Sequence, residues 1–101
     1  MTFAKNDLSQ AVVLFLGYGV ALSPICDGAK LFEIYGQQKG ESLLSDVLRL
    51  ADEASQISID WANTSLDAAG IAVHEEMHNR HPYLDSKALD AIAWKFTFDW
   101  R

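Results

Sequence analysis

Apolar side chains recur along most of this chain at intervals of three and four positions, the spacing of one face of an α-helix. The clearest run begins near Glu41. Its apolar positions are Leu43, Val47, Leu50, Ala54, Ile57 and Trp61. Polar and apolar residues alternate briefly within 56–61, and Thr64 stands three positions before Asp67, as in a helix-capping box. We therefore expect a helix from about residue 41, a break within residues 56–64, and a new helix after the break.

The helix after the break is expected to end near Arg80, because His81 precedes Pro82 and the residue before a proline avoids helical geometry. The residues on its core face are Leu66, Ala69, Gly70, Val73 and Met77. A last helix is predicted to start at Asp85, whose carboxylate can cap it. Its core stripe contains Leu89, Ile92, Ala93, Phe96 and Trp100. Residues 94–100 also alternate as a strand would, but no convincing partner strand exists, so a helix is the favoured interpretation.

The first third of the chain is apolar almost without interruption. A helix from Asn6 or Asp7 to about Leu22 would be the most buried element, although Gly17 and Gly19 weaken it and a strand is the alternative. Ser23 and Pro24 have the order of an N-cap and a first helical residue. Two further glycines, at 36 and 40, are expected to bracket a loop. The prediction is an all-α fold, a bundle of four to five helices forming one domain over residues 1–101.

Composition agrees with a small globular protein. Of the 101 residues, 50% are hydrophobic, which is enough for one core without a disulfide or a metal. The single cysteine, Cys26, suits a reducing compartment and is expected to be buried. The apolar run at 11–22 is too short to span a bilayer comfortably, and its flank lacks the positive charge of a signal peptide. We expect a cytoplasmic protein.

The charge distribution indicates the kind of partner. The net charge is −6, and residues 41–76 contain eight acidic residues against Arg49 alone. Such a surface disfavours nucleic acid and anionic membranes and favours a basic protein. Four of the acids, Asp46, Glu53, Asp60 and Asp67, recur every seven residues and would form one ridge on an unbroken helix.

One catalytic motif is present in the segment His74-Glu75-Glu76-Met77-His78. In zinc proteases, two histidines spaced in this way bind the metal and the glutamate after the first acts as a general base. A third ligand would have to come from Asp85, Asp90, Asp99 or His81, none of which stands in a second motif. On a helical wheel both histidines lie at the edge of the core face and Glu75 faces solvent. We therefore expect boundary histidines and no cofactor, with a zinc hydrolase using His74, His78 and Glu75 as the alternative.

Two aromatic residues on the last helix do not fit its core stripe. Trp94 and Phe98 lie one turn apart and roughly 140° from Leu89, so one core face cannot bury both sets. They are candidates for contact with a partner protein or with a second copy in a homodimer. Together with the four acids they predict a non-catalytic protein that binds a basic partner, in the manner of an antagonist, an immunity protein or a regulator.

Overall fold

Five α-helices make up the fold of residues 5–22 and 24–100, the part of the chain that the computed structural model describes. In chain order they are α1 (Lys5–Leu16), α2 (Ala29–Tyr35), α3 (Gln37–Ser55), α4 (Leu66–Arg80) and α5 (Ser86–Asp99). No strand occurs within these ranges. The all-α prediction is confirmed. The strand-like alternative for residues 94–100 is wrong, because these residues up to Asp99 continue α5.

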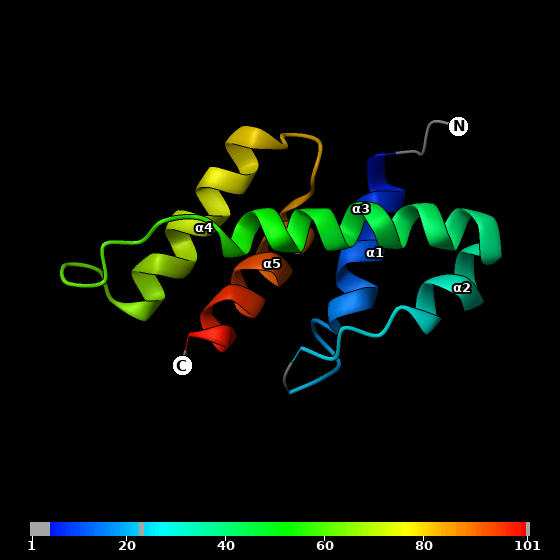
Figure 1. Ribbon diagram of the computed structural model, residues 1–101, viewed down its shortest axis with the longest axis horizontal. Coiled ribbons are helices and arrows are strands. Elements are labelled where there is room, and N and C mark those ends of the chain that lie inside the picture. The colour runs from blue at the N-terminus through cyan, green and yellow to red at the C-terminus, as the bar shows by residue number, and fades with distance from the viewer. Residues whose placement is uncertain (1–4, 23, 101) are drawn as a thin grey trace.

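The helices are arranged around α1 and α3 (Figure 1). The long helix α3 crosses the molecule, α2 folds back beside its N-terminal half, and α4 lies at the other end beside α5. The core draws on all five helices and on Leu84. Its largest fully buried apolar side chains are Leu16, Leu31, Leu43, Met77, Val12, Val47 and Val73. The molecule measures 44 × 27 × 19 Å, so it is long and thin.

The first helix is shorter than predicted, because glycine ends it. Gly17 adopts φ +75°, and the backbone N–H groups of Gly17 and Tyr18 both donate to the carbonyl of Val13, which closes the helix. Residues 17–22 and 24–28 then form a loop in which Cys26 is exposed, so the predicted buried thiol is wrong. Ser23, the predicted cap of the second helix, lies outside the described residues. That helix begins later, at Ala29, whose N–H donates to the carboxylate of Asp27.

The predicted loop between Gly36 and Gly40 is also wrong. Only Gly36, at φ +82°, separates α2 from α3, and Gly40 is a buried residue in the first turn of α3. A Cβ atom there would lie 2.9 Å from Cδ1 of Phe32 and 3.1 Å from the carbonyl oxygen of Leu31. Gly40 therefore serves the close packing of α2 on α3.

The break after α3 was predicted correctly. The helix ends at Ser55, and α4 starts after Ser65, whose hydroxyl accepts from the N–H of Ala68. The N-cap is therefore one residue later than the predicted Thr64. The end of α4 before Pro82 and the capping of α5 by Asp85 are confirmed, with Asp85 accepting from the N–H of Ala88 at 2.9 Å.

A hydrogen bond between residues far apart in the sequence joins α1 to the start of α5. Ser9 is buried on α1, and its hydroxyl accepts from the N–H of Asp85 at 3.0 Å. This bond fixes the start of α5 against α1. None of the helices in the described part of the chain is both long enough and apolar enough to cross a membrane.

Candidate functional site

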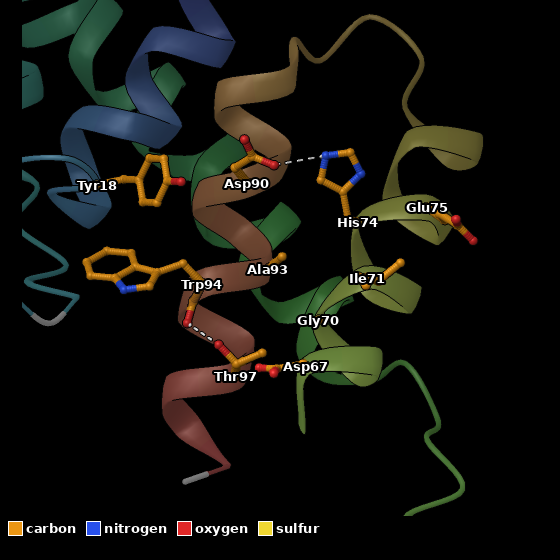
Figure 2. Close-up of a pocket in the computed structure, with 10 residues that line it drawn as sticks. All are labelled: Tyr18, Asp67, Gly70, Ile71, His74, Glu75, Asp90, Ala93, Trp94 and Thr97. Atoms are coloured by element: carbon orange, nitrogen blue, oxygen red, sulfur yellow. Dashed lines mark hydrogen bonds and ion pairs between the residues drawn. The ribbon is translucent and has the colours of Figure 1, made fainter. Parts of the chain in front are cut away.

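An open groove of about 580 Å³ runs along the α4–α5 pair. Figure 2 shows α5 at its centre, with α4 on one side and Tyr18 and Trp94 on the other. The residues that line it are Tyr18, Asp67, Gly70, Ile71, His74, Glu75, Asp90, Ala93, Trp94 and Thr97.

The spacing of the lining residues follows from the helices that carry them. The contributions of α4 are residues 67, 70, 71, 74 and 75, and those of α5 are residues 90, 93, 94 and 97. In both sets the successive steps are three and one, so every residue lies three or four positions from another residue of its set. Each set is therefore one stripe along about two turns of helix. The groove is thus bounded by two helical stripes that face the same space.

Small residues allow α4 and α5 to pack closely beneath the groove. A Cβ atom on the buried Gly70 would lie 2.8 Å from Cγ2 of Thr97. The hydroxyl of Thr97 donates to the carbonyl of Trp94, which keeps this polar group satisfied within α5. Besides Gly70, the small residues Ala93 and Thr97 line the groove.

The walls are apolar. The rings of Tyr18 and Trp94 are tilted by 57° with their centroids 5.4 Å apart, a favourable aromatic geometry. On the opposite wall Ile71 is 62% exposed. These three side chains leave apolar surface uncovered within one groove.

Acidic residues stand around this apolar surface. Asp67 lies at one end beside Thr97, and Asp90 lies toward the other end, where its carboxylate is 3.1 Å from Nε2 of His74 (Figure 2). Glu75 stands on the outer edge of α4. The arrangement combines an apolar middle with carboxylates near both ends, so it favours an apolar occupant flanked by positive charge.

The structure places the zinc-protease motif at the edge of this groove. His74 is partly buried against Asp90, one of the third ligands considered from the sequence, whereas His78 and Glu75 are exposed. Among the described residues, no group of three or more His, Cys, Asp or Glu side chains has the geometry to hold a metal ion. Metal binding by His74 and His78 therefore stays the alternative to the predicted boundary histidines.

The four periodic acids do not form one helical ridge, because the helix breaks at Ser55. Asp46 and Glu53 lie on α3, Asp60 lies in the following loop with its carboxylate accepting from the side-chain amide of Asn63, and Asp67 lies in the first turn of α4. Of the four, Asp67 alone lines the groove. Their roles in partner binding stay predictions.

The two aromatic candidates on α5 are both half-buried, and they differ in position. Trp94 packs on Tyr18 and on the core and lines the groove, whereas Phe98 does not line it.

Trp100, which was predicted to continue the core stripe, is 55% exposed. It lies at the C-cap of α5 beside Trp61, with their ring centroids 5.2 Å apart. Trp61 in turn stacks on the buried Phe96, so a loop residue closes the end of the core.

A second polar cluster, which the sequence did not reveal, joins α3 to the end of α4. Glu53 is 2.9 Å from Nε2 of His81 and accepts from Arg80 at 3.1 Å. His81 Nδ1 is 2.9 Å from the hydroxyl of Tyr83. The bond from His81, with a smaller contribution from Arg80, lowers the pKa of Glu53 although partial burial opposes the shift. Burial, and then the charges of Asp46 and Glu53, raise the pKa of Tyr83.

The sequence did contain one signal for the groove. Ile71 lies off the core face of Leu66, Ala69, Val73 and Met77, so its exposure could have been anticipated from the helical period. Its position opposite Trp94 could not, because that depends on how α4 packs on α5. In comparisons with known proteins, no family model matches this chain, and no similar curated protein or solved structure was found.

Proposed function

We propose that this protein acts by binding a basic partner protein through the α4–α5 groove, and that it regulates or antagonises the partner by covering part of its surface. The single observation that carries the proposal is the combination of exposed Ile71 and half-buried Trp94 with Asp67 and Asp90 in one groove. Apolar anchors supply most of the energy of protein interfaces, and surrounding charges select the partner and speed its approach.

The charge of the whole molecule supports a basic partner. At a net charge of −6, long-range attraction raises the rate of encounter with a positive surface and opposes encounter with a negative one. A small-molecule ligand is less well supported, because the groove is open along its length and its acids stand at the ends and the outer edge.

The proposal can be tested by differential affinity capture from the cells that express the gene naturally. The test variant carries Asp67→Lys, Glu75→Lys and Asp90→Lys. The matched control carries the same charge change on α2 and α3, at the exposed residues Glu33, Glu41 and Asp52. Both variants should keep their helical circular dichroism spectrum, since surface charge changes usually cost little stability.

We expect a basic protein to be retained by the wild type and by the control variant and to be lost with the groove variant. Its association rate should also fall as ionic strength rises, because exposed charges are screened within about 10 Å in 0.1 M salt. Captured proteins that bind the groove variant as well as the wild type, or that present an acidic contact surface, would refute the proposal.

A further inference from the structure

We propose that the occupant of the groove is an amphipathic α-helix of the partner, which lies along α5 between α4 and the Tyr18–Trp94 pair. This inference rests on the proposed function and adds the conformation and residue pattern of the bound segment. It follows from three observations: the packing of α4, the periodicity of the lining residues, and the positions of the acids.

The packing of α4 leaves one side of it open. Among the described helices, α5 is the only one against which α4 packs extensively, whereas α1 packs against α2, α3 and α5. The buried residues of α4, namely Ala69, Gly70, Val73 and Met77, form its core-facing side. Ile71 and His74 lie beside that stripe, at the groove. A helix seated there would give α4 a second neighbour.

The periodicity of the lining selects a helix over an extended strand. Both stripes repeat at three and four residues, so their side chains form the ridges and gaps into which the side chains of another helix pack. An extended peptide would instead need unpaired backbone N–H and C=O groups along the groove. Backbone groups within α4 and α5 are already bonded inside their helices.

The acids predict where positive charges occur on the bound helix. Asp67 marks one acidic end of the groove, and Asp90 marks the other through its contact with His74. Asp67 precedes His74 by seven residues on α4, so the two ends are about 10 Å apart along that helix. Seven residues of a bound helix span the same length. We therefore expect Lys or Arg at positions i and i+7, and apolar side chains at i+3 and i+4 that reach Ile71 and Trp94.

A second copy of this chain fits the groove less well. It would bring the same carboxylates, Asp67, Glu75 and Asp90, toward their own counterparts, and like charges at an interface oppose association. The groove therefore favours a heterologous basic helix over a homodimer.

Selection from two displayed peptide libraries tests the inference. Both libraries contain the same randomised mixture of Lys, Arg, Ala and large apolar residues. One presents them on the exposed face of a stable helical scaffold, and the other has prolines at every third position, which prevent a helix. The baits are the wild type, Ile71→Glu in the groove, and Ile34→Glu on α2, where Ile34 is 54% exposed and does not line the groove.

We expect binders from the helical library alone, with the predicted pattern of basic and apolar positions. Ile71→Glu should weaken them at least tenfold and Ile34→Glu should not. Groove-dependent binders from the proline library alone would overturn the helical inference and leave the proposed function standing. Absence of any groove-dependent binder from both libraries would overturn both. Self-association of the wild type in sedimentation that Ile71→Glu abolishes would identify a second copy as the occupant and overturn the inference.

Discussion

At the scale of single residues, burial follows the helical period along α3, whereas Trp61 and Trp100, which were also expected on core faces, are exposed. Leu43, Val47, Leu50 and Ala54 lie in the core as the sequence predicted. Ser9 shows the limit of that reasoning. It is buried and bonded to the backbone of Asp85, a residue 76 positions away, and no local pattern around a serine indicates such a partner.

The aromatic residues of α5 allow a direct test of their different environments. Phe96 is 4% exposed, and removal of a buried phenylalanine ring costs about 3–5 kcal/mol, so Phe96→Ala should destabilise the protein severely. Trp94 is half-buried against Tyr18, and Trp94→Ala should cost about 1–2 kcal/mol. Urea denaturation gives both values. Equal losses for the two variants would mean that Trp94 is a core residue and would weaken its assignment to a binding surface.

Glu53 should make stability depend on pH in the acid range. Since the bonds from His81 and Arg80 lower its pKa in the folded state, Glu53 contributes stability that is fully present above the unfolded pKa, about 4.3, and is lost as the pH falls through the folded value. Glu53→Gln should therefore lower stability at neutral pH and flatten its decline below about pH 4.3.

The measurement for Glu53 is the free energy of unfolding in urea at a series of pH values. Glu33→Gln is the matched control, because Glu33 is exposed on α2. Parallel pH curves for the wild type and Glu53→Gln would show that the bonds seen at Glu53 do not contribute to folding.

At the scale of helices, the start or end of a helix was predictable where the residue at that position has a single structural effect. Pro82 and Asp85 mark an end and a start in the structure as they did in the sequence. The roles of Gly17 and Gly40 were not predicted, because a glycine can either end a helix or allow two helices to pack closely. Gly17 ends α1, whereas Gly40 lies inside α3 under Phe32, and only the tertiary structure distinguishes the two roles.

Two of the glycines in the α1–α2 loop, Gly17 and Gly19, allow backbone strain to be measured separately from side-chain clashes. Gly17 and Gly19 have φ of +75° and +87°, so alanine is strained at either position, by about 1–2 kcal/mol. A Cβ atom on Gly17 would also clash with Cγ1 and Cδ1 of Ile25, whereas nothing lies within 4 Å of the same atom on Gly19. Gly17→Ala should therefore lower the melting temperature more than Gly19→Ala. Equal losses would show that Ile25 moves aside without cost.

At the scale of the whole molecule, the sequence predicted the fold class but not the candidate site. Trp94, Asp67 and the histidine motif were each recognised as unusual. Their assembly around one groove depends on the packing of α4 on α5, where Gly70 leaves room for the side chain of Thr97. The predicted acidic ridge is absent because residues spaced by seven share one surface only while the helix continues, and α3 ends at Ser55.

The core across α1–α5 is built from apolar side chains, so we expect it to fold without a metal. Treatment with EDTA should therefore leave the melting temperature unchanged, and added Zn²⁺ should not raise it. His74→Ala with His78→Ala provides the control. A fall of many degrees with EDTA that this double variant no longer shows would establish a structural metal at these histidines.

The limited packing of α4 has a consequence for the motions of the native state. A helix held mainly by one neighbour can detach while the remaining helices stay folded, so its amide protons should exchange with solvent through a local opening of lower free energy than global unfolding. Hydrogen–deuterium exchange should therefore label α4 before the buried turns of α1 and α3. A ligand in the groove should slow the exchange of α4 most, so a helix that opens locally in the free protein would also report the arrival of its partner.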